Sequence, residues 1–391
     1  MKHLKQLYLA GVLLLLSMSL FTASALAAPQ VFVSNVEELY SSVNDPANAG
    51  VQIALAPGLY MLTPTTPSGA PRPNRGRLEL QENMSLTGVI GDRSAVVIDA
   101  SMLPQSSYQG GGPPLTGAIR LGRGSNAVEW LTTQNATVGS AAIEADLVWP
   151  GAANIRIANI ASTGNIRGLD IRNFGPASSG ETINVEIEDS DFFDNTLGLG
   201  EGVRVGNFAG ANGATVNLKM SGNRSYGNDQ GRLIVNNAAN NCTINVTSNG
   251  NRFFNNGSGT NILGGLGGGQ PANGNTINYT SHGDHYFDNT GFSDFDLGGL
   301  VFVGGENIAV PYNANNNTVV ARLWGNRFWG NQVADLQLYG AKSLPASVGI
   351  PGIGNSVTVE LNGKGAKPFS LLIIQSTPEE PTNSNIATLI Q

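Results

Sequence analysis

The feature that most constrains this 391-residue chain is a repeat that begins near residue 182. Each repeat opens with a short run in which apolar and polar residues alternate, and the runs start at Ile183, Val216, Ile244, Ile277, Val319 and Val357. Six residues after each start comes a glycine, or Asp189 in the first repeat. Aromatic residues follow, and the first five repeats then close on an asparagine: Asn195, Asn228, Asn256, Asn289 and Asn331. The starts are 33, 28, 33, 42 and 38 residues apart, so the internal order is fixed while loop lengths vary.

This pattern predicts a solenoid of short strands and turns. A single coil cannot bury its own apolar face, so coils stack at roughly 4.8 Å and equivalent residues form columns. Aliphatic and aromatic stacks and a ladder of the closing asparagines are therefore expected. A second strand in each repeat alternates as well, and we interpret its inward pairs as Val203/Val205, Leu233/Val235 and Val301/Val303. A tandem array of immunoglobulin-like sandwiches would need longer antiparallel hairpins.

The N-terminal part of the chain predicts how the solenoid is closed. Ser34 and Glu37 have the spacing of a capping box, and Val36, Leu39, Tyr40 and Val43 share one helical face. Strand-like segments follow that contain Ala-Pro-Gly-Leu-Tyr at 56–60, Ser-Leu-Thr-Gly at 85–88 and Val-Val-Ile-Asp at 96–99. A short helix of this kind would cover the open edge of the first coil.

These segments together resemble the pectin-lyase-like superfamily, over residues 31–363. The resemblance implies an all-β, single-stranded right-handed parallel β-helix with a short N-terminal capping helix. It implies no single activity, because the superfamily includes lyases, hydrolases, esterases and non-catalytic adhesins. The Gly-His-Gly and Arg-x-Lys of polygalacturonase-type members are replaced by Ser281-His282-Gly283 with no Arg-x-Lys after it. The Trp-Ile-Asp-His and Arg-x-Pro-x-x-Arg of pectate-lyase-type members do not occur, so no catalytic residue is carried over.

The first 27 residues have the pattern of an export signal: Lys2 and Lys5, then an apolar run, then Ala25-Leu26-Ala27. We therefore predict a signal peptide over 1–27, a β-helix domain over 28–363 and a C-terminal cap or tail over 364–391. The mature chain is expected to be secreted or in the cell envelope, with no membrane span. Loss of Lys2 and Lys5 moves the net charge from −7 to −9, which disfavours nucleic acid and anionic membranes as partners. Cys242 is the single cysteine, so no internal disulfide is expected.

Alignment of the second strands predicts a column of outward-facing residues that begins Arg120, Glu144, Asp170, Arg204 and later includes Phe302. We assign Glu144, Asp170 and Arg204 as candidate catalytic residues. Arg120, Arg172 and Phe302 are candidate substrate-binding residues. Two carboxylates on adjacent coils either share a cation or differ in pKa. Glu144 and Asp170 are therefore also candidate Ca²⁺ ligands, and their spacing suits the carboxyl pair of a retaining glycosidase.

Two alternatives remain open for this column and for the function. The column is either a site or a salt-bridge ladder in which the arginines neutralise the carboxylates. The protein is then either a monomer that binds or processes an extracellular or cell-wall polysaccharide through a groove on one sheet face, or a non-catalytic adhesin or spacer. A polysaccharide lyase or glycoside hydrolase is the expected enzyme class. His282, Asp284, His285 and Asp288 cluster near one turn, but their spacing fits no zinc signature and favours polar turn residues.

Overall fold

The computed structural model describes residues 29–104, 117–122, 124–138, 141–147, 151–198, 200–267, 269–291, 298–308, 313–343, 352–362, 370–377 and 384–391. Within these residues the strands form three sheets, which we name A, B and C. Sheet A contains β1 (Gln30–Val33), β2 (Gln52–Leu55), β5 (Ser85–Thr87), β8 (Gly124–Glu129), β11 (Ala153–Ala158), β14 (Thr182–Glu188), β17 (Thr215–Ser221), β20 (Thr243–Asn249), β23 (Thr276–His282), β26 (Thr318–Trp324), β29 (Ser356–Asn362) and β31 (Ile386–Ile390).

Sheets B and C are built in the same order along the solenoid. Sheet B contains β3 (Gly58–Met61), β6 (Val96–Asp99), β9 (Thr132–Gln134), β12 (Ala161–Thr163), β15 (Asp191–Phe193), β18 (Arg224–Tyr226), β21 (Arg252–Phe254), β24 (His285–Phe287) and β27 (Arg327–Trp329). Sheet C contains β4 (Leu78–Glu79), β7 (Ile119–Arg120), β10 (Ile143–Leu147), β13 (Arg167–Phe174), β16 (Glu201–Phe208), β19 (Gln230–Asn237), β22 (Ser258–Gly267), β25 (Leu300–Asn307), β28 (Leu336–Ser343) and β30 (Leu371–Thr377).

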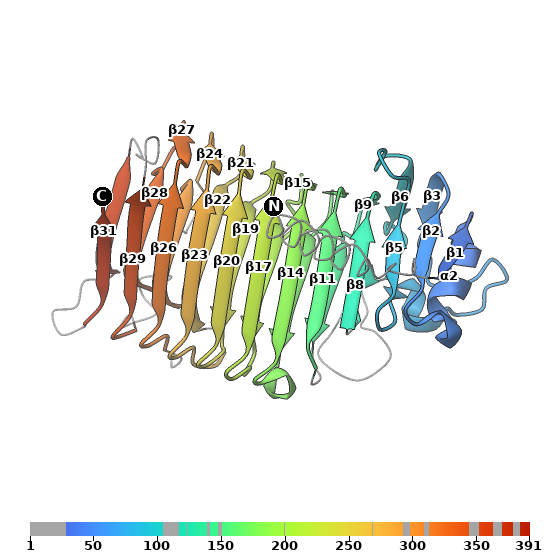
Figure 1. Ribbon diagram of the computed structural model, residues 1–391, viewed down its shortest axis with the longest axis horizontal. Helices are drawn as coiled ribbons and strands as arrows, with labels where there is room; N and C mark the ends of the chain where they lie inside the picture. The colour runs from blue at the N-terminus through green and yellow to red at the C-terminus, as the bar shows by residue number, and fades with distance from the viewer. Residues whose placement is uncertain are drawn as a thin grey trace, which may run out of the picture.

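The chain winds from sheet A to B to C and back to A, adding one strand to each sheet per coil, as in β14, β15, β16 and then β17. Neighbouring strands pair in parallel, for example β14 with β17 and β16 with β19. The coils therefore stack along one long axis, with the N-terminal strands at one end and β31 at the other (Figure 1). The parallel β-helix predicted from the repeat is confirmed.

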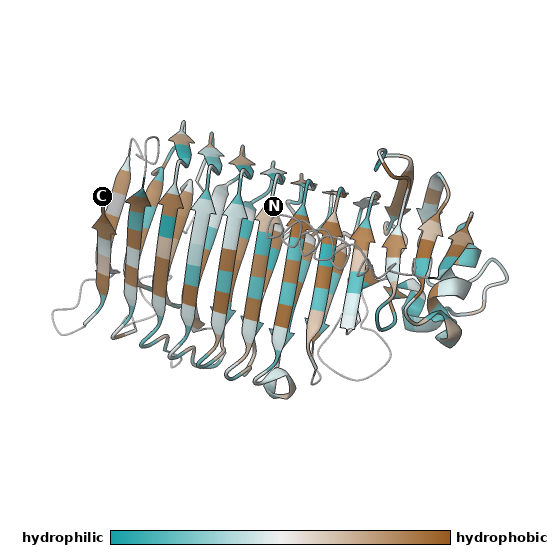
Figure 2. Cartoon of the chain, in the orientation of Figure 1, coloured by the Kyte–Doolittle hydropathy of each residue, from teal (hydrophilic) through white to brown (hydrophobic). Residues whose placement is uncertain are grey.

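The register of sheet A follows the repeat. Ile183, Val216, Ile244, Ile277, Val319 and Val357 pair in one column, and each is fully buried. Figure 2 shows the resulting bands of apolar and polar residues along the strands of this sheet. The turn residue six positions later needs a left-handed backbone: Asp189 has φ 46° and Gly222 has φ 68°. Glycine and aspartate tolerate this region, which explains their recurrence.

The turns from sheet B to sheet C are held by the predicted asparagine ladder. The backbone N–H of Asn195 donates to Asn228 Oδ1 at 3.0 Å, and Asn228 repeats this contact to Asn256 at 3.1 Å. The ladder continues through Asn289 to Asn331. Aromatic residues of sheet B stack inside the solenoid, as Phe253 on Tyr286 (5.2 Å between ring centroids), and a second aromatic row stacks on its outer surface, as Tyr226 on Phe254 (4.9 Å). Buried amides and stacked rings thus fix the coil spacing.

Helix α2 (Val36–Asn44) covers the N-terminal end of the solenoid beside β1 and β2 (Figure 1). The predicted capping box is displaced by one residue: the Glu38 backbone N–H donates to Asn35 Oδ1 at 3.0 Å, and the Glu38 carboxylate accepts from Ser34 N at 2.7 Å. Asn35 has an extended backbone, so it and not Ser34 is the N-cap. Leu39, Tyr40 and Val43 are buried against the first coils, as predicted. Short 3₁₀ turns lie at Pro46–Asn48 and Pro176–Ser178, whereas Pro73–Gly76 contains two left-handed residues, Asn74 and Arg75.

At the C-terminal end the sheets continue past residue 363. Strand β30 pairs with β28 in sheet C, and β31 pairs with β29 in sheet A. The segment predicted as a cap or tail thus contributes strands to two of the sheets. No helix in the described parts of the chain is long and apolar enough to cross a membrane. The predicted signal peptide, residues 1–27, lies outside the described residues.

Candidate functional site

The predicted column of charged residues exists on sheet C. Arg120 of β7 pairs with Glu144 of β10, Glu144 pairs with Asp170 of β13, and Asp170 pairs with Arg204 of β16. Adjacent members are one strand apart, roughly 4.8 Å. Alternation of side chains places this column on the outer side of the sheet, because Leu169 and Ile171 on either side of Asp170 enter the core.

The column is not an open row of solvated charges. Glu144 and Asp170 have 0% of their surface exposed, and Arg120 has 4%. Arg204 binds Asp170 through two nitrogens, with its Nε 2.9 Å from Oδ1 and its Nη2 on Oδ2. The Glu144 carboxylate accepts the backbone N–H of Gly117 at 2.7 Å. Arg120 Nη1 donates to Glu79 of the preceding strand in sheet C at 2.9 Å.

Arg172 joins the carboxylates of three residues. Its guanidinium contacts Glu144 Oε1 at 3.1 Å, Asp146 Oδ2 at 2.6 Å and Asp170 Oδ2 at 3.4 Å. Asp146 is a member of this group that was not predicted. Its position contained a usable signal, because Asp146 lies two residues after Glu144 on the same strand, as Arg172 lies two residues after Asp170. Residues two apart on a strand share a face.

A second ion pair completes what we call the charged cluster. Arg167 Nε lies 2.6 Å from Glu201 Oε2, and Arg204 Nη1 lies 3.9 Å from the other Glu201 oxygen. The cluster comprises Glu144, Asp146, Arg167, Asp170, Arg172, Glu201 and Arg204. Its carboxylates are at most 2% exposed, whereas its arginine side chains are 12–13% exposed. Carboxylates therefore lie beneath a partly exposed layer of guanidinium groups.

The environment separates the acid strengths of two of these carboxyls. Burial would raise the pKa of Asp170, but Arg172 and Arg204 outweigh it and hold that pKa at about 2. Burial raises the pKa of Asp146 to about 8, with Glu144 and Asp170 adding to the shift and Arg172 opposing it. Burial also raises the pKa of Glu201. The pKa values of Asp170 and Asp146 are thus shifted in opposite directions, although Arg172 contacts both, with its Nε 2.5 Å from Asp146 Oδ1 and 3.4 Å from Asp170 Oδ2.

Aromatic rings hold the arginines of the cluster in place. The Arg172 guanidinium carbon is 5.4 Å from the ring centroids of both Phe174 and Phe208, and that of Arg204 is 5.3 Å from Phe208. Cation–π contacts at this distance favour a fixed side-chain orientation. The guanidinium groups are thereby pre-organised rather than free to rotate.

The prediction that Phe302 belongs to this column is wrong. Arg204 pairs with Leu233, Leu233 with Asn261, and Asn261 with Val301, so Phe302 is one residue out of register. One residue of slip reverses the side of the sheet. Phe302 is therefore buried in the core with 0% exposed, where its ring meets Tyr279 edge-on at 5.6 Å.

The same slip corrects the predicted inward pairs Leu233/Val235 and Val301/Val303. Val203 pairs with Arg232 and Val205 with Ile234, so Arg232 and Ile234 face the core instead. Leu233 and Val235 belong to a separate apolar cluster with Val301, Val303 and Tyr339.

The Ca²⁺ interpretation of Glu144 and Asp170 stays a prediction. Both carboxyl groups contact guanidinium nitrogens. No group of three or more His, Cys, Asp or Glu side chains placed to hold a metal ion occurs among the described residues. Asp284 of the His282–Asp288 turn occupies an interior ladder, where it accepts the backbone N–H of Asn251 at 2.8 Å.

Comparisons with known proteins found similar solved structures but no family. No protein-family model and no curated protein matches the chain. Among solved structures, the A-module of the mannuronan C-5 epimerase AlgE4 from Azotobacter vinelandii is 16% identical, with 92% of this chain and 97% of that chain covered and a TM-score of 0.47. The pectate lyase Pel9A is 16% identical over 87% of this chain and 80% of that chain, with a TM-score of 0.43. The catalytic domain of a GH87 α-1,3-glucanase is 11% identical over 93% and 68%, with a TM-score of 0.38. At these identities the likeness is one of fold.

Proposed function

We propose that the protein is exported and binds and processes an acidic extracellular polysaccharide at the charged cluster of sheet C. The observation that carries the proposal is geometric: Arg172 contacts the buried carboxyls of both Asp146 and Asp170, beneath a layer of arginine side chains that are 12–13% exposed. The pKa values of these two carboxyls shift in opposite directions, upward for Asp146 through burial and downward for Asp170 through Arg172 and Arg204. Perturbed titrations of this kind concentrate at functional sites.

The position of the arginines supports an anionic substrate. Arg167, Arg172 and Arg204 are the more exposed members of the cluster, so an incoming chain would meet their guanidinium groups before the carboxylates. Guanidinium groups bind carboxylates with two parallel hydrogen bonds. A uronate carboxylate would thus replace one of the internal carboxylates as the partner of Arg172 or Arg204. These arginines would offer positive charge to the substrate on a protein whose net charge is negative.

In this proposal the ionised and protonated carboxyls divide the chemistry. Asp170, kept ionised by Arg204, supplies the fixed negative charge or base. Asp146 gives or takes the proton, and Glu144 sets the field that favours protonation of Asp146. Arg172 binds substrate, the role predicted for it, whereas Arg204 orients Asp170 and is a positioning residue instead of the catalytic residue that the sequence predicts. Arg120 is a positioning residue through its contact with Glu79.

The test is turnover of defined polyuronides. Purified protein is incubated with polygalacturonate and with alginate, with and without Ca²⁺, and unsaturated products and reducing ends are measured. Asp146→Asn and Asp170→Asn should each abolish release while the fold, followed by circular dichroism, persists. Glu360→Gln is the control, because it removes an exposed carboxylate that pairs with Arg322 on sheet A at 3.3 Å.

One observation favours a second candidate, a non-catalytic surface or spacer protein. The internal partners of the cluster satisfy one another, as in the two-point contact of Arg204 with Asp170. A closed network of this kind stabilises a sheet face without any substrate. Absence of product from every polyuronide, together with unchanged glycan binding in Asp146→Asn and Asp170→Asn, would decide for this candidate.

A further inference from the structure

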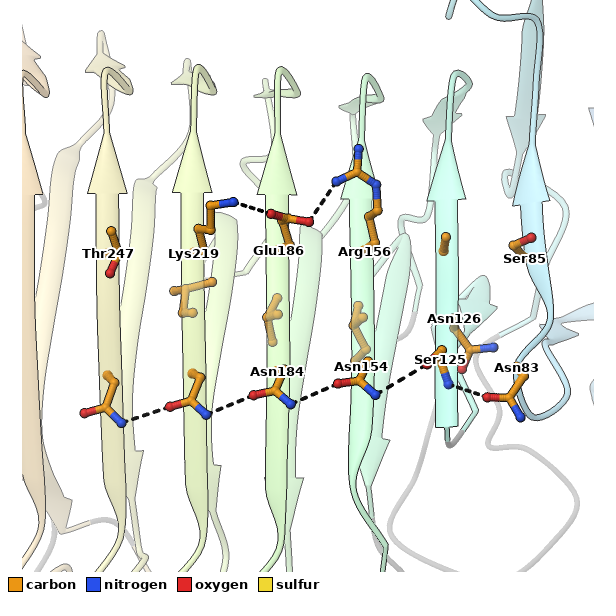
Figure 3. A pocket seen from close by; sticks show the side chains of 16 residues that line it. Asn83, Ser85, Ser125, Asn126, Asn154, Arg156, Asn184, Glu186, Lys219 and Thr247 are labelled. Carbon is orange, nitrogen blue, oxygen red and sulfur yellow. Dashed lines mark hydrogen bonds and ion pairs between the residues drawn. The ribbon is translucent and has the colours of Figure 1, made fainter. Parts of the chain in front are cut away.

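A separate polar surface lies on the outer face of sheet A. A groove of about 730 Å³ runs across β5, β8, β11, β14, β17 and β20. Figure 3 shows two rows of side chains along it, one of amides and one of charged groups, both parallel to the solenoid axis. Six strands correspond to a length of roughly 24 Å at the usual strand spacing. The groove thus suits an extended chain that follows the axis.

The amide row is a continuous hydrogen-bonded ladder. Asn184 Nδ2 donates to Asn154 Oδ1, Asn217 Nδ2 to Asn184 Oδ1, and Asn245 Nδ2 to Asn217 Oδ1, each at 2.9 Å. An amide has two N–H groups and two acceptor lone pairs on its oxygen. Each amide inside the ladder uses one of each, and the remaining donor and acceptor face outward. The row therefore offers alternating donors and acceptors at every coil.

This ladder differs from those inside the turns. The interior asparagines satisfy backbone groups, as when Asn228 Oδ1 accepts the backbone N–H of Asn195 at 3.0 Å. In the described chain, Asn184, Asn217 and Asn245 contact one another through their side chains and satisfy no backbone group. Exposed amides would be solvated equally well by water. The fold itself thus does not require this row.

The second row is charged but internally neutralised. Arg156 contacts Glu129 at 2.8 Å and Glu186 at 2.8 Å, and Lys219 contacts Glu186 at 2.5 Å. The hydrogen bond from Lys219 lowers the pKa of Glu186, and the same contact raises the pKa of Lys219. Both cations are therefore engaged. Glu188 also contacts Arg156, and Glu129 and Glu188 lie beside the groove and not in its lining. Together with Glu186 they place three carboxylates around two cations, so this part of sheet A has no net positive charge to attract a polyanion.

We infer that this groove binds a neutral polysaccharide along the solenoid axis, at a surface distinct from the charged cluster of sheet C. Sugar hydroxyls both donate and accept, which matches the free donor and acceptor of each amide. The hydrogen-bonded ladder holds the amides in one orientation, so little side-chain entropy is lost on binding. The ion-paired row can form hydrogen bonds with sugar hydroxyls, and it does not favour a charged polysaccharide over a neutral one.

The test is affinity electrophoresis in native gels that contain laminarin, xyloglucan or dextran, with polygalacturonate as the acidic comparison. Wild-type protein should be retarded by at least one neutral polysaccharide, and 0.5 M NaCl should leave that retardation unchanged. Asn184→Ala combined with Asn217→Ala should weaken binding about tenfold or more, since several hydrogen bonds are lost. Asn278→Ala is the matched control, because Asn278 belongs to the same ladder at 2.9 Å but lies outside the groove.

The outcomes separate this inference from the proposed function. Asp170→Asn should leave neutral-polysaccharide binding intact whatever it does to polyuronide turnover. No retardation in any neutral gel would overturn the inference. The inference would also fail if the double variant bound like Asn278→Ala at equal thermal stability. Loss of neutral binding in Asp170→Asn with a preserved fold would place the ligand on sheet C and overturn it too.

Discussion

Arg232 is a full positive charge inside the solenoid. Its side chain has 0% exposed, and its guanidinium carbon lies 4.4 Å from the Phe253 ring centroid. Its nitrogens donate to Tyr279 Oη at 2.7 Å and to Ser248 Oγ at 3.1 Å. The Ser248 hydroxyl in turn donates to Asp284, a buried carboxyl at an interior ladder position otherwise held by asparagines. Arg232 is therefore linked to the Asp284 carboxyl through the Ser248 hydroxyl.

We predict that Arg232→Leu lowers the free energy of unfolding by about 3–5 kcal/mol, because it leaves a buried carboxylate without its cation. Leucine suits the site sterically, since Leu300 and Leu336 occupy the same inward column. The loss should be recovered in large part by adding Asp284→Asn, which restores the amide found at Asn251 and Asn326 in that ladder. The coupling energy of the two substitutions is expected to be about 2 kcal/mol or more.

The measurement is urea-induced unfolding of the four proteins of the double-mutant cycle, followed by circular dichroism at pH 7. The free energy lost in Arg232→Leu should be larger than the free energy lost when the same substitution is made in the Asp284→Asn background. The reasoning is refuted if the effects of the two substitutions are additive.

Three further predictions concern stability. Asp170→Asn should destabilise the protein by about 2 kcal/mol at pH 7, because the pKa of Asp170 is about 2 in the folded state against an ordinary 3.8. This contribution to stability is fully present above pH 3.8 and is lost as the pH falls through 2. Urea unfolding between pH 7 and pH 2 should therefore show the difference in unfolding free energy between wild type and variant disappearing. Asn256→Ala should cost about 1–3 kcal/mol in urea unfolding because it orphans a buried backbone N–H, whereas Asn278→Ala on the outer ladder should cost about 0.5 kcal/mol or less. Phe253→Ala in the interior stack should cost about 3–5 kcal/mol and Phe254→Ala in the outer stack about 1–2 kcal/mol, and equal losses in thermal melts would contradict the assignment of the two stacks.

Sheet A was readable from the sequence because each of its strands has one apolar side. The alternation at Ile183, Val185 and Ile187 leaves a single way to bury the strand, and the next repeat copies it at Val216. Turn glycines and closing asparagines fix both ends of each unit, so an error of one residue would break the whole pattern. The register therefore followed from local chemistry alone.

Sheet C was harder because its middle strands are apolar on both sides. The run Leu233-Ile234-Val235 has no alternation, so period-2 reasoning could not choose between the two faces. A usable signal precedes the strand: the residue after a glycine faces the core, as in Gly202-Val203 and Gly231-Arg232. A Cβ at Gly231 would lie 2.5 Å from the carbonyl oxygen of Gly259, which is why glycine recurs there. Counting from this glycine would have placed Arg232 and Phe302 inside.

The charged column of sheet C could be predicted because its residues are ionisable, whereas the sequence analysis predicts an asparagine ladder only at the closing turns and not on the outer face of sheet A. The physical difference between the interior and outer asparagines is the parity of their positions. Asn184 and Asn217 alternate with core residues such as Val185 and Leu218, so they must face outward, whereas the closing asparagines follow left-handed turns and face inward. An outward residue that recurs at one position through successive coils makes a continuous surface only after stacking. Successive members of this row are 28 to 33 residues apart in the sequence, so the row is not evident there. In the β-helix the same residues lie on adjacent strands, one strand spacing apart.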